Sequence, residues 1–411
     1  MDIFISRKTP FKCVTNNLLY HSLSKISSTK RRKQTVKPYR KRAWAEVSLD
    51  SLEGNIRSIQ KSLSLGTEIM AVIKADAYGH GEGEICHKLE EIGIKYFAVS
   101  NLDEAISVRE HCSNGDILIL GYTPPEYAIE LESYNIIQGV ISLEHAAYLA
   151  QNAKNKVRCH IKVDTGMGRV GLKHYNVRDC VDEIEEIIKL DKLSVEGIYT
   201  HLAVADSRNK SDIAYTKAQI DYIHAVYDEL KNRGIFLTHI HYLNSAGFCY
   251  HDDGKSTLAR IGIIMYGLHP NYEMELPYDL KPVLSLKAII SQVKTIDKGD
   301  FVSYGRTFCA QSQMKVATVT VGYADGYSRL LSSKGEALVQ GKRCKIIGRV
   351  CMDQLVLDVS CLENVQAGEI VTLIGKDGDD IITADELANI YGTIGYEVVC
   401  GISKRVPRIY V

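Results

Sequence analysis

The 411-residue chain lacks several features that mark specialised protein classes. It has no run of about 18 consecutive apolar residues, so we expect no membrane-spanning helix. None of its 11 cysteines forms a Cys-x-x-Cys pair, which leaves no legible zinc signature and no disulfide framework. We therefore expect no metal site, reduced buried thiols and a cytoplasmic location.

A net charge is also lacking, because Lys plus Arg and Asp plus Glu number 50 each. The balance is uneven along the chain. Residues 1–42 hold 12 of the basic residues and one acid, Asp2, which leaves 38 basic and 49 acidic residues for the rest. The body is therefore mildly acidic, and we expect no nucleic-acid partner. The basic segment contains no apolar stretch typical of a secretory signal. Its composition predicts a disordered extension without a role in the chemistry, and the alternatives are a transit-type peptide or a nucleic-acid-binding tail.

Residues 43–281 predict an α/β domain, because short apolar runs alternate there with helix-like segments. Eight runs are apolar on both faces, as in parallel strands covered by helices. They span 68–75, 95–100, 116–122, 136–141, 156–164, 193–201, 238–245 and 256–261. Eight repeats predict a (β/α)8 TIM barrel. The alternative is a doubly wound open sheet, but no Gly-x-Gly-x-x-Gly follows the first run.

Residues 282–411 predict a mostly β C-terminal domain, because strand-like runs follow one another with turn signals between them. The runs span 283–296, 315–322, 336–347, 351–358, 367–374 and 396–402. One helix is predicted at 383–391, with Thr383 as its N-cap. An early strand-like run at 43–49 is a candidate member of the same domain.

Lys74 ends the first apolar run of the predicted barrel. Burying an ammonium group is costly, and the active sites of barrels lie at the C-terminal ends of their strands. A desolvated lysine has a lowered pKa and can form a Schiff base. The alternative without a function is a lysine whose amine reaches solvent at the strand end.

A second candidate feature follows the eighth run, in TLARIGIIMYG. If the strand ends near Arg260, the amides of Gly262 and Ile263 open a short helix and form an anion site. Barrels commonly bind phosphate after strands seven and eight, and Ser245 ends the seventh run. An ordinary strand-to-helix turn is the alternative. A lysine and a phosphate site together indicate a phosphate-bearing aldehyde cofactor.

Further polar residues end the fifth and sixth runs. Lys162, Asp164 and Arg169 lie at the end of the fifth. Arg169 could bind a carboxylate with two hydrogen bonds, and the alternative is that the three form a loop salt-bridge cluster. His201 ends the sixth run, although a lone histidine is more often a core residue. Taken singly, the tyrosines of the C-terminal domain suggest packing or interface residues.

Seven motifs occur in order between about residue 43 and the C-terminus: AVIKADAYGHG, KVDTGMGR, ARIGIIMYG, SYGRTF, GYADG, RVCMDQ and SKRVPR. Together they resemble the alanine racemases. This family resemblance implies pyridoxal 5'-phosphate as cofactor and a homodimer with active sites at the subunit interface. It implies that Lys74 and Tyr304, the latter from the partner subunit, are the two catalytic bases.

The resemblance also implies roles for the remaining motif residues. The cofactor would be bound by Lys74, Tyr78, His201, Ser245, Arg260, Gly262, Ile263 and Tyr396. Arg169 and the backbone at Met352 would bind the substrate carboxylate region. Tyr323, Asp353 and Lys162 would line or support the entrance, and Lys162 occupies the position that is carbamylated in some relatives.

The implied activity is interconversion of L- and D-alanine, which supplies D-alanine for peptidoglycan. Serine is an alternative substrate, because one extra hydroxyl in a small pocket is hard to reject. Less favoured alternatives are a related pyridoxal-phosphate barrel decarboxylase or dehydratase, a barrel aldolase that uses Lys74 directly, and a cofactor-binding barrel without activity.

Overall fold

The computed structural model describes residues 42–112 and 114–411. The predicted disordered extension, residues 1–42, therefore lies outside the described residues except for Arg42. This residue is anchored: its Nη1 donates to the Thr320 carbonyl at 2.6 Å, and its guanidinium pairs with the buried Asp325. Thr320 Oγ1 donates back to the Arg42 carbonyl at 2.6 Å. The predicted extension thus includes one residue that belongs to the folded chain.

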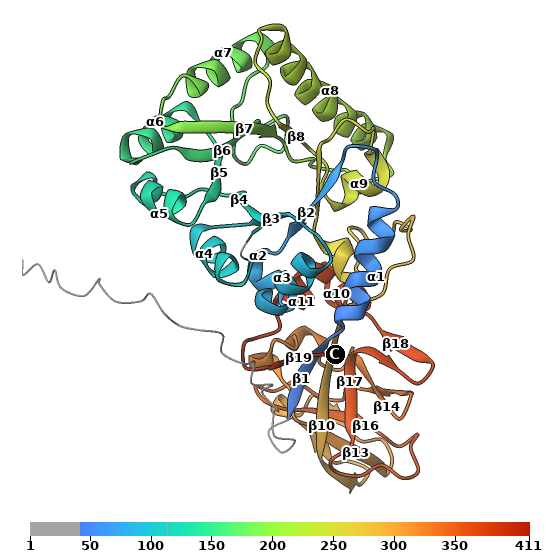
Figure 1. The fold of residues 1–411 in the computed structure, drawn as a ribbon. Helices are drawn as coiled ribbons and strands as arrows, with labels where there is room; N and C mark the ends of the chain where they lie inside the picture. Colours follow the sequence, from blue (N-terminus) through green and yellow to red (C-terminus); the bar gives the residue numbers. More distant parts are fainter. Residues whose placement is uncertain (1–41, 113) are drawn as a thin grey trace, which may run out of the picture. The chain divides into compact units, whose positions relative to one another are not determined.

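The barrel is built from eight parallel strands, as the sequence predicts (Figure 1). Their order is β8-β7-β6-β5-β4-β3-β2-β9. They span β2 (Glu68–Val72), β3 (Tyr96–Val99), β4 (Asp116–Ile119), β5 (Ile136–Val140), β6 (Val157–Lys162), β7 (Leu193–Tyr199), β8 (His239–His241) and β9 (Leu258–Ile261). The amides of Thr257 and Arg260 donate to the carbonyls of Ile240 and Leu243, which links the β8 and β9 segments and nearly closes the barrel.

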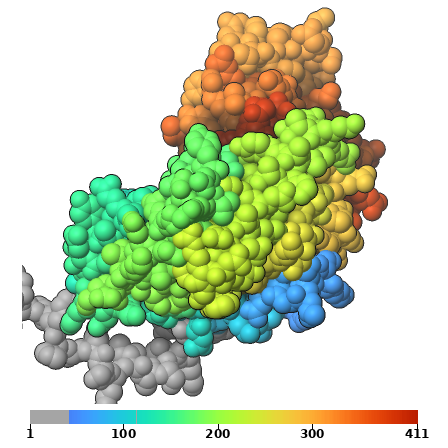
Figure 2. Space-filling model, turned by 90° about the horizontal axis from the view of Figure 1, so that it is seen from above, coloured from blue at the N-terminus to red at the C-terminus, as the bar shows by residue number. Residues whose placement is uncertain are grey.

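Helices surround the strands because each has one apolar stripe; in α1, for example, it consists of the buried residues Leu52, Ile56 and Ile59. The layer comprises α1 (Leu49–Gln60), α3 (Glu82–Glu91), α4 (Leu102–His111), α5 (Ala128–Ser133), α6 (Leu143–Asn152), α7 (Val177–Ile188), α8 (Lys210–Asn232) and α9 (Ser245–His251). The segment coloured green to yellow-green, which includes α7 and α8, forms the outer surface on the face shown in Figure 2. Among the described residues, no helix has the length and apolar character that a membrane span requires.

Strands dominate the C-terminal part, as predicted, and most of them pair antiparallel. Its main sheet contains β10 (Leu284–Ile296), β13 (Met314–Val319), β14 (Glu336–Val339), β15 (Lys342–Lys345), β16 (Leu355–Asp358), β17 (Ile370–Asp377), β18 (Asp380–Ile382) and β19 (Arg408–Tyr410). A separate hairpin joins β11 (Phe301–Val302) to β12 (Phe308–Cys309). The helix α10 (Ala384–Tyr391) is present, and Thr383 Oγ1 accepts the Glu386 amide as its N-cap.

One predicted strand is wrong. Residues 396–402 do not form a strand, because the helix α11 (Gly395–Cys400) occupies this segment. The β-branched pair Val398 and Val399 suggested a strand, but these two side chains are buried on one side of a helix that packs beside α2 (Lys74–Tyr78). Tertiary packing has overridden the local strand propensity of this segment. The contact between α11 and α2 joins the C-terminal part to the barrel.

The strand β1 (Ala43–Val47) belongs to the C-terminal sheet rather than to the barrel. It pairs antiparallel with β10, where Ala45 lies opposite Leu286, and parallel with β19. From β1 onward the chain therefore leaves the β sheet to build the barrel and then returns to the same sheet. The Ser48 amide donates to the Val283 carbonyl at 2.8 Å, so the outgoing and returning segments are directly joined.

The cysteines differ from expectation at one pair. Cys86 in α3 and Cys112, which follows α4, form a disulfide in the structure, whereas the sequence suggested reduced thiols throughout. Both are fully buried, and the packing of α3 beside α4 places their Cα atoms 6.2 Å apart, within the range that a disulfide spans. The other described cysteines are free.

A left-handed turn follows β2. Four consecutive non-glycine residues, Ala75 to Tyr78, have φ values of +53° to +54°. Each such residue costs about 1–2 kcal/mol, because its Cβ crowds the following carbonyl. The turn is held by neighbouring groups: Glu104 Oε1 accepts the Ala75 amide at 2.9 Å, and Asp76 Oδ1 accepts the Glu82 amide at 2.8 Å. Lys74 immediately precedes this strained segment.

We predict that Ala75→Gly raises the free energy of unfolding of the cofactor-free protein by roughly 0.5–1 kcal/mol. Relief of the left-handed strain exceeds the entropy cost of the added glycine. The matched control is Ala214→Gly in the right-handed helix α8, which should cost about 1 kcal/mol. Chemical denaturation of both variants measures the difference, and a loss of the same size in both would contradict the strain.

Candidate active site

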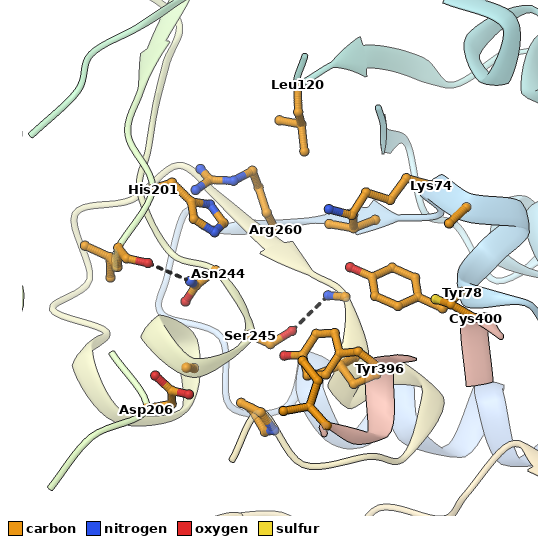
Figure 3. A pocket seen from close by; sticks show the side chains of 18 of the residues that line it. Lys74, Tyr78, Leu120, His201, Asp206, Asn244, Ser245, Arg260, Tyr396 and Cys400 are labelled. Atoms are coloured by element: carbon orange, nitrogen blue, oxygen red, sulfur yellow. Dashed lines mark hydrogen bonds between the residues drawn. The ribbon is translucent and has the colours of Figure 1, made fainter. Parts of the chain in front are cut away.

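A cavity of about 520 Å³ lies at the C-terminal ends of the barrel strands (Figure 3). All eight residues predicted to hold the cofactor line it: Lys74, Tyr78, His201, Ser245, Arg260, Gly262, Ile263 and Tyr396. Most come from strand ends of the barrel, whereas Tyr396 comes from α11. The barrel fold thus gathers motifs that lie nearly 200 positions apart along the chain, and the C-terminal part supplies one wall.

Lys74 follows β2 and extends its amine into this cavity. Burial lowers its pKa, and the nearby cation of Arg169 lowers it further, while the carboxylate of Glu104 acts in the opposite direction. No ion pair joins the amine to a carboxylate within residues 42–112 or 114–411. These surroundings favour a neutral amine, which is the form able to attack a carbonyl or accept a proton.

The other end of the cavity carries groups that can bind an anion. Ser245 Oγ accepts the Gly262 amide at 3.0 Å, as the dashed line in Figure 3 shows. The hydroxyls of Tyr78 and Tyr396 line the same region and form no hydrogen bond with the described residues, and their ring centres are 6.0 Å apart. A Cβ on Gly262 would lie 2.8 Å from the Tyr78 hydroxyl, so a glycine keeps this space open. The hydroxyls of Tyr78, Ser245 and Tyr396 and the amide of Gly262 together form an open anion cradle, which fits a phosphate group.

Arg260, at the end of β9, is buried without a carboxylate partner among the described residues. Its Nη1 donates to Nδ1 and to the carbonyl oxygen of His241, both at 2.9 Å. Its Nη2 donates to the carbonyls of Thr200 at 2.6 Å and Tyr242 at 3.3 Å. Desolvation lowers its pKa to about 10, so the guanidinium stays protonated at neutral pH. Its Nε–H forms no hydrogen bond with the described residues.

The charged and titratable groups of His201, Lys162 and Arg169 lie near Arg260, and their surroundings lower the pKa values of His201 and Lys162. Burial lowers the pKa of His201 well below its usual value, and the cations Arg260 and Lys162 add to the effect. Desolvation, with Arg260 next, lowers the pKa of the buried Lys162 to about 7. Asp164 accepts the amides of Gly166 and Gly168 at 3.0 and 2.9 Å, which shapes the loop that leads to Arg169. Lys162 and Arg169 do not line the cavity itself.

The remaining predicted residues form a second group, on the surface of the β part and away from the lining of the cavity. Tyr304 is 72% exposed, and Met352 and Tyr323 are also exposed. The Tyr323 amide donates to the Cys351 carbonyl at 3.0 Å, which holds the Tyr323 and Met352 loops together. Asp353 forms an ion pair with Arg405 at 2.7 Å. One chain therefore does not bring Tyr304 to Lys74.

Some lining residues were not predicted from the sequence, among them Leu120, Met167, Asp206, Glu397 and Cys400. Cys400 lies four residues after Tyr396 on α11, and this spacing places both on one face of a helix. A strand would also place residues four apart on one face, so this spacing alone does not distinguish the two structures. For Leu120, Met167 and Asp206 we find no signal in the sequence beyond their position after barrel strands.

The fold and the cavity together define an enzyme with a (β/α)8 barrel and a mostly β second part. Models of two protein domains match the sequence: the alanine racemase N-terminal domain over residues 47–270 and the alanine racemase C-terminal domain over residues 283–410. These matches cover most of the chain. The chain belongs to the alanine racemase family, whose members are isomerases.

Individual relatives agree. The alanine racemase of Carboxydothermus hydrogenoformans is 43% identical over 373 residues, which cover 90% of this chain and 99% of that protein. The solved alanine racemase of Clostridium difficile 630 is 36% identical, with a TM-score of 0.85 over 92% of this chain and 97% of that one. The Bacillus anthracis alanine racemase with bound L-Ala-P is 35% identical, with a TM-score of 0.84 over 91% and 96%.

We predict that Gly262→Ala weakens binding of inorganic phosphate to the cofactor-free protein by about tenfold or more, because its methyl group intrudes on the Tyr78 hydroxyl. The control is Gly54→Ala in α1, where an added Cβ meets nothing within 4 Å. Calorimetry measures both affinities. Equal binding by the two variants would remove Gly262 from the phosphate cradle.

We also predict that Arg169→Ala raises the pKa of Lys74, because a nearby positive charge is removed. A larger fraction of the amine is then protonated at neutral pH, so reductive alkylation of Lys74 should slow and its pH profile should move to higher pH. Arg178→Ala, on the exposed start of α7, is the control. A profile that moves to lower pH, or equally in both variants, would contradict this electrostatic coupling.

Proposed function

We propose that this chain interconverts L- and D-alanine with pyridoxal 5'-phosphate as its cofactor. One observation carries the proposal: the amine of Lys74, with its lowered pKa, shares a cavity with an open anion cradle at the mouth of the barrel. The family to which the chain belongs, and the L-Ala-P bound to the Bacillus anthracis relative, support alanine as the substrate.

The residues of the cavity fit this cofactor. Lys74 Nζ would hold it covalently, and the hydroxyls of Tyr78, Ser245 and Tyr396 would bind its phosphate together with the amides of Gly262 and Ile263. When bound, the cofactor supplies an electron sink that acidifies the α-proton of the amino acid. Arg260 would face the ring nitrogen through its Nε–H. Because a guanidinium only donates, it holds this nitrogen unprotonated and so moderates the sink.

Racemisation requires that a proton leaves one face of the α-carbon and that another arrives on the opposite face. Lys74 is suited to one face, since burial and Arg169 favour its neutral form. Tyr304 would serve the other face. By the family resemblance, Lys74 removes the proton from D-alanine and Tyr304 removes it from L-alanine.

Tyr304 would come from a second copy of the chain. Its side chain is largely exposed and lies outside the lining of its own cavity, as do the exposed side chains of Phe301 and Met352. We therefore propose a homodimer in which each β part completes the partner's site. Arg169 and the backbone at Met352 would bind the substrate carboxylate region, while Tyr323, Asp353 and Lys162 would line or support the entrance.

The size of the substrate follows from the lining. The ring of Tyr396 lies within the cavity beside Tyr78, and this bulk favours a small side chain. Serine stays an alternative, since it differs from alanine by one hydroxyl. Supply of D-alanine for peptidoglycan and a cytoplasmic location also stay predictions.

A subunit-mixing experiment tests the shared site. Lys74→Ala and Tyr304→Phe should each lower racemisation by at least about a hundredfold, since each removes one acid/base group. When the two variants are unfolded, mixed and refolded, random pairing should restore roughly a quarter of the wild-type activity, because each heterodimer contains one intact site.

The control mixes Tyr304→Phe with the double variant Lys74→Ala/Tyr304→Phe, a combination that contains no intact site. It should show no recovery. If the two single variants also fail to complement one another while both form dimers, Lys74 and Tyr304 do not act across the interface.

A further inference from the structure

A chain of buried imidazoles leads away from Arg260 into the barrel interior. His241 Nε2 lies 2.8 Å from Nδ1 of His160, and His241 Nδ1 lies 2.9 Å from Nη1 of Arg260. His160 and His241 are 1% and 0% exposed. They lie on β6 and β8, below the cavity mouth.

The hydrogen bonds fix where the protons lie. A guanidinium has donors and no acceptor, so Nδ1 of His241 must be the bare nitrogen that accepts from Arg260. The ring proton of His241 is therefore on Nε2, from which it donates to His160. Nδ1 of His160 must then be bare as well, and its proton lies on Nε2. The donor character of Arg260 thus sets the tautomers of two successive histidines.

Neither ring can carry a second proton without breaking the hydrogen bonds that link His160, His241 and Arg260. A doubly protonated His241 would turn an N–H toward the guanidinium, and a doubly protonated His160 would turn one toward His241. Burial agrees with this, since desolvation lowers the pKa of His160 to about 3 and that of His241 well below its usual value. Both rings are therefore neutral across the physiological range of pH.

The ring of His241 is also held in orientation. It stacks on Tyr199 with a centroid distance of 4.9 Å and an angle of 5° between the planes. The chain ends at Nε2 of His160, which is buried and has no hydrogen-bond partner among the described residues. A buried unpaired N–H costs about 1–3 kcal/mol, so the fold retains it at a loss of stability. A buried group of this kind requires an explanation, and a role in a nearby site is one.

We propose that His160 is a positioning residue for Arg260. By accepting from His241 Nε2, it holds His241 in the tautomer that accepts from Arg260, and so keeps the Arg260 Nε–H free for the cavity. The function of that Nε–H, a donor to the cofactor ring nitrogen, rests on the proposed racemase activity. The tautomer assignment does not.

The first test is nuclear magnetic resonance of the cofactor-free wild-type protein with 15N-labelled histidine. His160→Gln and His241→Gln variants identify the two residues. We expect bare Nδ1 and protonated Nε2 in both rings. A proton on Nδ1 of His241, or a charged ring near neutral pH, would overturn the proposal, and neither result depends on cofactor or substrate.

The second test compares three variants. His160→Leu removes the acceptor and should lower kcat for alanine racemisation by about tenfold, the loss expected when a hydrogen-bond chain to a charged group is broken. His160→Gln can still accept through its side-chain oxygen and should stay within about threefold of wild type. His239→Leu changes a ring whose centroid lies 5.5 Å from that of His160 but which takes no part in the hydrogen bonds to Arg260. It should also stay within about threefold.

Pyridoxal-phosphate affinity is measured on the same variants, so that the positioning effect has a readout apart from turnover. We expect weaker binding in His160→Leu and recovery in His160→Gln. Equal losses in the Leu and Gln variants, or in His160→Leu and His239→Leu, would show that His160 only fills space. If no variant, nor the wild type, racemises alanine, the proposed function fails while the tautomers and the affinities still decide the role of His160.

Discussion

The structure depends on the desolvation of two basic side chains, Lys74 and Arg260, beside one cavity without an ion-paired carboxylate on either in the described part of the chain. An unpaired buried charge is expensive, and a carboxylate partner would be the usual solution. Here the fold satisfies Arg260 with neutral acceptors, three backbone carbonyls and one imidazole nitrogen. For Lys74 the same burial lowers the pKa of the amine. The positive field that results suits a phosphorylated, anionic ligand.

This constraint explains how the surrounding segments are arranged. The carbonyls that hold Arg260 belong to the ends of β7 and β8, so their direction is set by the barrel itself. On the opposite side, the left-handed turn after Lys74 turns the chain so that Tyr78 faces the cradle, and Glu104 fixes the first amide of that turn. Rigid backbone groups hold the site more firmly than long flexible side chains would, because they lose less entropy on ordering.

Much of the fold and of the cavity could be predicted from the sequence. The eight runs of the barrel follow from apolar periodicity, and Lys74, Ser245 and Gly262 follow from their positions after strands. The helix α11 could not be predicted in this way, since Val398 and Val399 favour a strand locally and only packing against α2 makes the segment helical. The disulfide of Cys86 and Cys112 was equally hidden, because it depends on which helices become neighbours. The position of Tyr304 outside the cavity could not be predicted from a local pattern either, since it depends on how the β part folds and which of its side chains stay exposed.

The strand β1 gives the two parts of the chain a second covalent connection. A single linker leaves one domain able to turn about several axes, whereas two adjacent crossings, joined by the Ser48–Val283 hydrogen bond, leave at most a hinge about one axis. Any opening of the barrel mouth by α11 would have to bend both crossings together. The wall that carries Tyr396 is therefore attached to the barrel at two points. This limits how far the cavity can widen from this side during product release.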